Sequence, residues 1–147
     1  MSQAKAFAYT SLINNLGETD WRPVLPITLA NKERIIKVSG LLDSGASVSV
    51  LPYQMGQALG FIWEQQTIKV NLGGNLAQQD ARGVTLLGAV GNMLPVELVF
   101  AWTKAENVPL ILGEMNFFKE FDVCFFRSRL AFAIQLKGSE DLDIMLF

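Results

Sequence analysis

Short apolar runs alternate along the chain with turns that contain glycine, proline or asparagine. In residues 67–72 apolar and polar side chains alternate strictly, which is the period of a half-buried strand. Residues 109–113 are continuously apolar, as in a strand buried on both faces. Such runs, bounded by turn residues, are typical of a mostly β domain. The pattern predicts strands at residues 24–29, 34–42, 67–72, 83–90, 94–102, 109–113, 123–126, 130–136 and 142–147.

Helical signals are few and short. Pro52 suits a first helical position, residues 54–59 follow it, and Gly60 suits the C-terminal stop. A second short helix is predicted over residues 114–120, where three phenylalanines fall on adjoining faces. We therefore expect a mostly β chain with one or two short helices.

The length of 147 residues favours one domain, and no repeat, low-complexity tract or linker divides it. We expect residues 1–20 to form an extended or partly disordered N-terminal segment, and residues 21–147 to form the single domain with a C-terminal strand. The end, residues 142–147, is apolar for a chain terminus. It can join an intermolecular sheet or be a disordered tail, and the sequence leaves both interpretations open.

Charge argues against two classes of partner. The net charge is −2 and no basic stripe is present, so neither nucleic-acid phosphates nor an anionic membrane is an expected partner. Trp21, Trp63 and Trp102 are accordingly interpreted as core or pocket-lining residues rather than as a platform for stacking bases. There is no secretory signal and no run of about 18 apolar residues, so the simplest location is cytoplasmic. Half of the residues are apolar, which is more than one small core requires.

The absence of histidine narrows the chemistry. It removes Ser-His-Asp and Cys-His nucleophiles and every metal site that uses histidine. The single cysteine, Cys124, can form neither an internal disulfide nor a two-cysteine metal clip, and we expect it to be a small buried apolar residue. We expect no metal and no other cofactor.

One stretch carries candidate chemistry, Leu41-Leu42-Asp43-Ser44-Gly45-Ala46-Ser47. An apolar strand delivers a carboxylate at its end, and the glycine lets the backbone turn sharply and approach a ligand. Because Asp, Ser and Gly are all favoured turn residues, an ordinary junction between strand and turn is the competing interpretation.

With its surroundings, this stretch resembles the retropepsin-like aspartic proteases, the family of the retroviral proteases and their cellular and bacterial relatives. Val50-Leu51-Pro52, a short helix and Leu59-Gly60-Phe61 follow it, as in the bacterial form of the signature. Later, Leu110-Ile111-Leu112-Gly113 resembles the second hallmark of the family, an apolar-apolar-Gly strand that leads into a helix. The resemblance covers residues 24–136 and implies a closed β-barrel or sandwich.

The resemblance implies a hydrolase in which two aspartates share one proton and activate a water. The chain contains only one Asp-Ser-Gly, so the second Asp43 must come from a second chain. This implies a C2 homodimer with the site on its axis and an extended peptide or protein as substrate. The alternative is a non-proteolytic peptide-binding or dimerisation module with the same fold.

The family resemblance also suggests a role for each residue of the motif. Asp43 is the catalytic carboxylate, and Ser44 ties the two active-site loops together across the dimer. Gly45 presents its backbone to the carboxylate and the substrate. Ala46 adds no hydrogen bond to the carboxylate, which by analogy favours activity at mildly acidic pH.

Two further segments belong to the implied site. Gly73-Gly74-Asn75 lies where the family has its flap, so it is either a flap tip that closes over the peptide or an ordinary hairpin turn. Ile111-Leu112-Gly113 is expected beside the catalytic loop. Retroviral members often pair an acidic and a basic residue at the places held here by Ser47 and Glu114. That salt bridge is absent from this sequence, so something else must brace the loop.

Overall fold

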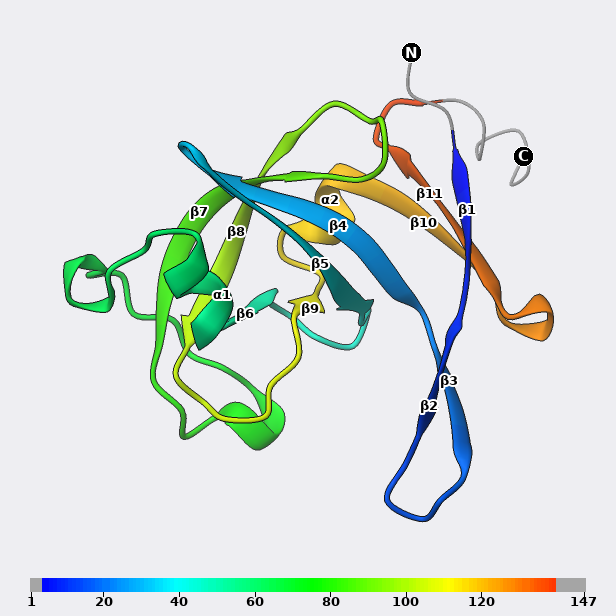
Figure 1. Ribbon diagram of the computed structural model, residues 1–147, viewed down its shortest axis with the longest axis horizontal. Helices are drawn as coiled ribbons and strands as arrows, with labels where there is room; N and C mark the ends of the chain where they lie inside the picture. Colours follow the sequence, from blue (N-terminus) through cyan, green and yellow to red (C-terminus); the bar gives the residue numbers. More distant parts are fainter. Residues whose placement is uncertain (1–3, 140–147) are drawn as a thin grey trace.

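The computed structural model describes residues 4–139, and β-strands dominate it. Six strands close into a barrel in the order β4-β5-β9-β6-β8-β7 (Figure 1). Most neighbouring strands are antiparallel, but β5 and β9 run parallel, as do β6 and β8. The barrel strands are β4 (Val24–Asn31), β5 (Arg34–Leu42), β6 (Val50–Pro52), β7 (Ala81–Ala89), β8 (Val96–Thr103) and β9 (Ile111–Leu112).

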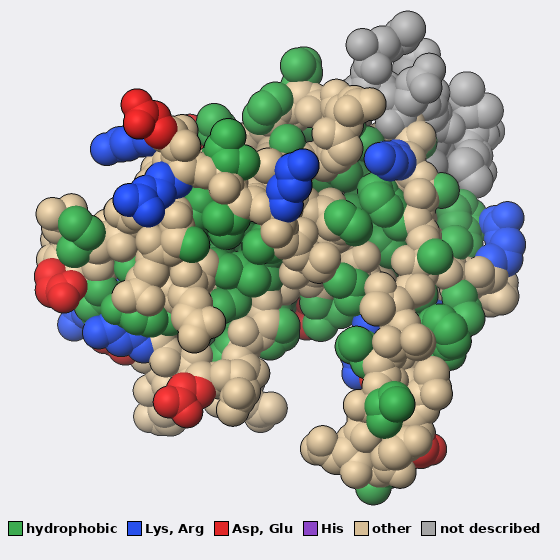
Figure 2. Space-filling model, viewed as in Figure 1, with side chains coloured by type: hydrophobic (Ala, Val, Ile, Leu, Met, Phe, Trp, Pro, Cys, Tyr) green, Lys and Arg blue, Asp and Glu red, His purple; other side chains and the backbone are tan. Residues whose placement is uncertain are grey.

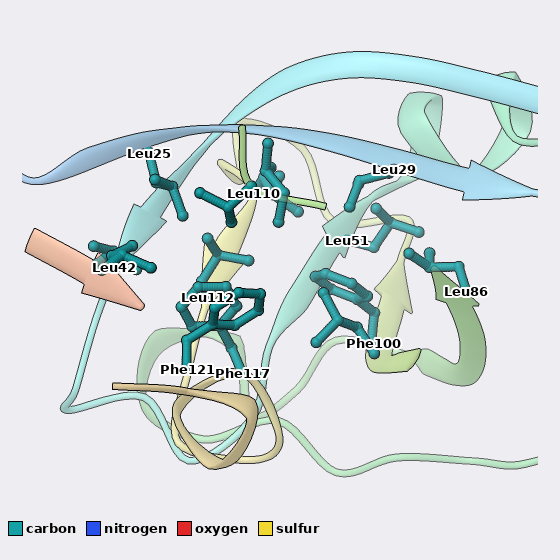
Figure 3. Packing of buried hydrophobic residues seen from close by; sticks show 14 of the residues in the cluster. Leu25, Leu29, Leu42, Leu51, Leu86, Phe100, Leu110, Leu112, Phe117 and Phe121 are labelled. Atoms are coloured by element: carbon teal, nitrogen blue, oxygen red, sulfur yellow. The ribbon is translucent and has the colours of Figure 1, made fainter. Parts of the chain in front are cut away.

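The barrel interior is filled by alternate side chains of its strands. Leu25, Ile27 and Leu29 are almost completely buried along β4, because every second side chain of a strand points to the same face. Figure 3 shows Leu25 and Leu29 above the remaining core. Phe117 and Phe121 close one end of this core with stacked rings whose centroids lie 4.7 Å apart.

A second sheet lies outside the barrel in the order β1-β11-β10. It consists of β1 (Lys5–Ala8), β10 (Phe121–Phe126) and β11 (Ala131–Leu136). Strands β2 (Thr10–Ile13) and β3 (Thr19–Arg22) form a separate two-stranded hairpin that projects from the body (Figures 1 and 2). Residues 4–20, the described part of the expected N-terminal segment, thus include β1, β2 and the start of β3.

The helices are short, as the sequence predicts. They are α1 (Tyr53–Ala58) and α2 (Phe117–Glu120), with single 3-10 turns at Trp63–Gln65, Gly74–Leu76 and Arg127–Arg129. Gly60 follows α1 with a φ of +84°, the left-handed conformation that glycine adopts without strain. Along the part of the chain that is described, no helix has the length and apolar character needed to cross a membrane.

Several strand predictions need correction. The strand predicted at residues 109–113 spans only Ile111–Leu112. Residues 67–72 form no regular strand, because they pair with β7 only around a single bridge between Lys69 and Arg82. Leu72 then turns inward and is buried in a small second cluster with Val50 and Ala81. The strand predicted at residues 94–102 begins only at Val96, after a turn. The strand predicted at residues 142–147 lies outside the described residues.

Two side-chain predictions also differ from the structure. Trp102 is fully buried and Trp63 packs against it, but Trp21 is 39% exposed on the projecting hairpin and belongs to no core. Cys124 is half-buried in β10 rather than buried, because β10 covers the body with only part of its surface. Aromatic and sulfur side chains indicate that a residue can be buried, but not whether its strand is covered.

Candidate active site

Asp43 stands immediately after the last residue of β5. Its backbone N–H donates to the Leu112 carbonyl at 3.0 Å. The turn that follows is closed by two hydrogen bonds to Asp43, from the Ala46 N–H to its carbonyl (3.1 Å) and from the Gly45 N–H to its Oδ1 (3.0 Å). Asp43 is half-buried, so part of the residue remains accessible. The chain thus presents one oriented carboxylate at the end of a barrel strand.

The second predicted segment lies directly beside this carboxylate. Strand β9 runs between β5 and β6, pairing Leu41 with Ile111 and Leu42 with Leu112 on one side. On the other side Ile111 pairs with Val50. The two halves of the predicted site, which are far apart in sequence, are therefore adjacent strands of one sheet.

Backbone pairing continues past the end of β9 and braces the Asp43 loop. The Glu114 N–H donates to the Ala46 carbonyl at 2.8 Å, and the Met115 N–H donates to the Ser47 carbonyl at 2.9 Å. The side chains of Ser47 and Glu114 are both exposed. Main-chain hydrogen bonds between the two segments therefore support the loop in place of the salt bridge that the sequence lacks.

Gly113 is required by this close approach of two backbones. A Cβ at this position would lie 2.5 Å from the carbonyl oxygen of Val48 and 2.8 Å from that of Ala46. Real Cβ atoms do not approach backbone oxygens so closely, so any side chain here would push the two segments apart. Gly113 is a glycine because the Asp43 loop occupies the space of its side chain.

Ser49 is a supporting residue that sequence reasoning missed. Its side chain is buried, and its hydroxyl accepts a hydrogen bond from the Gly113 N–H at 3.0 Å and donates to the Met115 carbonyl at 3.4 Å. Its own N–H donates to the same carbonyl at 3.0 Å. The sequence does place the Ser49 hydroxyl between two apolar residues, Val48 and Val50. A polar side chain in such a run requires a hydrogen-bond partner if the run is buried, and this could have identified Ser49.

The open side of the loop is accessible. Ser44 and Gly45 are exposed and Ala46 is half-buried. Beside them lies a shallow hollow of about 360 Å³. Its lining consists of Gly45, Ser47, Glu114, Met115, Phe118 and Lys119. A ligand or a second protein surface can thus reach the Asp43 loop without any rearrangement of the barrel.

The segment predicted as a flap is attached to β7 and not to the strand ends that carry the Asp43 loop. Gly73-Gly74-Asn75 lies in the connection between residues 67–70 and β7, and Gly74 begins a 3-10 turn with a φ of +58°. A Cβ on either glycine would meet no atom within 4 Å. The buried side chain of Leu72 anchors the base of this connection to the barrel. The loop is therefore held at its base and open at its glycines.

Charged groups near the base of this loop form a local pair. Arg82 donates a hydrogen bond to Asp80 and stacks its guanidinium over the Trp63 ring, 4.8 Å from the ring centroid. The hydrogen bond from Arg82 lowers the pKa of the Asp80 carboxyl below its usual value. Within residues 4–139, no group of three or more Cys, Asp or Glu side chains is arranged to hold a metal ion.

Sequence comparisons find no matching family model and no matching curated protein. Solved structures do match. One is a retropepsin-like aspartic protease from Rickettsia conorii, with a TM-score of 0.63 and 16% identity over 92% of this chain and 94% of that one. Another is the retroviral protease-like domain of Ddi1 from Leishmania major, with a TM-score of 0.58 and 13% identity over 80% of this chain and 90% of that one.

The chain has the retropepsin-like fold. The mostly β architecture and the closed barrel expected from the sequence are confirmed by this likeness and by the strand order. At such low identities, similarity of structure shows the fold alone. Activity must therefore be argued from the residues around Asp43.

Proposed function

We propose that this retropepsin-like chain is an aspartic endopeptidase that acts as a homodimer. The observation that carries the proposal is the position of Asp43, which stands at a strand end on an accessible loop whose backbone is fixed by Gly113 and its neighbours. Each chain supplies one such carboxylate. Two chains related by a two-fold axis supply a pair.

The proposed chemistry needs only this pair and a water. Two carboxyls a few ångströms apart cannot both stay ionised, so they hold one proton between them and titrate as a unit. The ionised Asp43 of one chain takes a proton from the water while the water oxygen attacks the scissile carbonyl carbon. The protonated Asp43 of the other chain donates its proton to the carbonyl oxygen. Collapse of the tetrahedral intermediate breaks the C–N bond and passes a proton to the leaving amine.

The remaining residues of the motif have supporting roles in this proposal. The exposed Ser44 hydroxyl ties the two loops together across the dimer, and the Gly45 N–H holds the Asp43 carboxylate through the hydrogen bond at 3.0 Å. Gly73-Gly74-Asn75 closes over an extended peptide and excludes water, which strengthens the electrostatic interactions inside the site. The open space around both glycines supports such a movement.

The test is cleavage of a denatured protein from about pH 4 to about pH 7, the range suited to a carboxylate pair. Asp43→Asn keeps the size of the side chain but removes its ability to ionise, and we expect it to lower the rate by about 10³-fold or more. Glu64→Gln, which removes an exposed carboxylate elsewhere, is the matched control and should retain the full rate. Equal cleavage by wild type and Asp43→Asn would exclude the proposed catalytic role.

The same experiment separates the enzyme from the alternative. A non-proteolytic module with this fold would bind an extended peptide or dimerise but leave the substrate intact. Light scattering and peptide binding measured on the same samples identify that outcome. If a verified dimer binds peptide without cleaving it at any pH tested, the proposal of protease activity is wrong and the binding module takes its place.

A further inference from the structure

The β2–β3 hairpin, which we call the arm, pairs with no other strand among residues 4–139. It is a sheet of only two strands, and every side chain of β2 is exposed. In Figure 2 the arm extends away from the body of the molecule. An isolated two-stranded hairpin is at best marginally stable in water, so a structure of this kind gains from a surface that covers it.

One face of the arm is uncharged. Directly opposed residues of antiparallel strands share a face, and Ser11 opposes Trp21 while Ile13 opposes Thr19. Ile13 is 78% exposed and Trp21 is 39% exposed on this face. Leu16, at the turn of the arm, is also largely exposed. We call the face made by Ser11, Ile13, Thr19 and Trp21 the uncharged face.

The opposite face suits contact with water. There Thr10 opposes Arg22 and Leu12 opposes Asp20. Arg22 Nε and Asp20 Oδ2 form an ion pair at 2.8 Å, with both side chains substantially exposed. The arm is therefore amphipathic, and only its uncharged face can be buried without removing charges from water.

The base of the arm lies beside the candidate active site. The Leu42 N–H donates to the Pro23 carbonyl at 3.0 Å, and Val24 pairs with Leu41 at the start of β4. The arm therefore leaves the barrel next to the strand end that carries Asp43. If two Asp43 carboxylates meet on a two-fold axis, both arms start close to that axis and next to the other chain.

We propose that the uncharged face of each arm packs against the partner protomer in the homodimer. This inference rests on the proposed function, because the shared Asp43 site is what brings the base of the arm to the interface. A tryptophan and an isoleucine on a face that carries no charged residue have the composition of the buried centre of an interface. In a two-fold dimer the contact is made twice, once by each arm, so a modest contribution from each has a doubled effect on assembly.

The test compares the two faces of the arm in the full chain. Ile13→Ser combined with Trp21→Ser alters the uncharged face, and Leu12→Ser on the charged face is the matched control. Sedimentation equilibrium should show the dimer dissociation constant raised by about 10-fold or more in the double variant and by less than about 2-fold in the control. Circular dichroism and urea unfolding verify that the barrel, which the arm does not enter, remains folded.

The outcomes distinguish the arm from the proposed function. An unchanged dissociation constant in the double variant would overturn the role of the arm and leave the shared Asp43 site intact. An unchanged dissociation constant with a raised KM for peptide would also overturn it, because the occupant of the face would then be the substrate. A dimer that the double variant weakens but that never cleaves peptide would support the arm and contradict the protease. A wild-type chain that is monomeric at high micromolar concentration would overturn the arm contact.

Discussion

Two glycine-containing loops are both predicted to serve the active site, but the space around their glycines differs. Gly113 is enclosed by the backbone of the Asp43 loop, with carbonyl oxygens at 2.5 and 2.8 Å from the place of a Cβ. Gly73 and Gly74 are surrounded by open space. The same residue type thus serves close packing at one loop and freedom of the backbone at the other. The comparison indicates that the carboxylate is held by a rigid frame, while the proposed flap is held only at its base.

The largest effect is expected from Gly113→Ala. The new methyl group would collide with the backbone carbonyls of Ala46 and Val48, so the Asp43 loop and the end of β9 would have to separate. We expect the free energy of unfolding to fall by about 3 kcal/mol, measured by urea denaturation, and cleavage to be lost even where the variant remains folded. A variant as stable as wild type would show that the two backbones are not closely packed.

The next effect is expected from Ser49→Ala. Loss of the hydroxyl leaves the buried Gly113 N–H without its hydrogen-bond acceptor, which costs about 2 kcal/mol of unfolding free energy. The matched control is Ser47→Ala, two residues away, whose side chain is exposed and should contribute less than about 0.5 kcal/mol. Equal changes in the two variants would mean that the buried hydroxyl has no special role in the frame.

A smaller effect is expected at the open loop, and it should differ between adjacent glycines. Gly74 has a φ of +58°, so Gly74→Ala should lower the free energy of unfolding by about 1 kcal/mol. Gly73 has a φ of −100° and free space around it, so Gly73→Ala should change it by less than about 0.5 kcal/mol. If Gly73→Ala nevertheless lowers kcat/KM, the loop moves during catalysis. If Gly73→Ala changes neither the free energy of unfolding nor kcat/KM, the loop is an ordinary turn.

The smallest effect concerns the Asp80–Arg82 pair at the base of the open loop. The hydrogen bond from Arg82 lowers the pKa of Asp80 in the folded chain below the usual 3.8. As the pH falls, Asp80 is therefore protonated in the unfolded chain before it is protonated in the folded chain. The contribution of the pair is complete above the pKa of the unfolded state and disappears as pH falls through that of the folded state. Unfolding free energy measured from about pH 5 to about pH 2 should therefore fall less steeply in Asp80→Asn. Identical slopes would mean that the pair is not formed in solution.

Much of the frame was predictable from the sequence. The segments that form β4, β5 and β7 have clear strand patterns in the sequence. The position of residues 111–113 beside the Asp43 loop was expected from the family resemblance. The segment at residues 67–72 was not predictable in the same way, since its alternation suits a strand but it pairs with β7 only around the Lys69–Arg82 bridge. The alternation of apolar and polar residues describes one strand at a time, whereas a sheet requires a neighbouring strand in register with it.

The sequence by itself limited the chemistry that the chain can offer. A chain without histidine and with one Asp-Ser-Gly can offer a carboxylate but no imidazole. This limit depends only on which residue types are present, whereas a site shared between two chains is what the family resemblance implies. The alternation of apolar and polar residues that favours strands is likewise local, although a neighbouring strand is needed before such a segment forms a sheet.

Only the tertiary structure decided how that carboxylate is supported and which apolar surfaces remain uncovered. The hydroxyl of Ser49, the missing side chain of Gly113 and the carbonyl of Val48 meet because β9 inserts between β5 and β6. Trp102 and Trp21 are the same residue type, yet one fills the barrel and the other stands on the arm. Burial depends on what the rest of the chain places nearby, and that information is spread over residues far apart in the sequence.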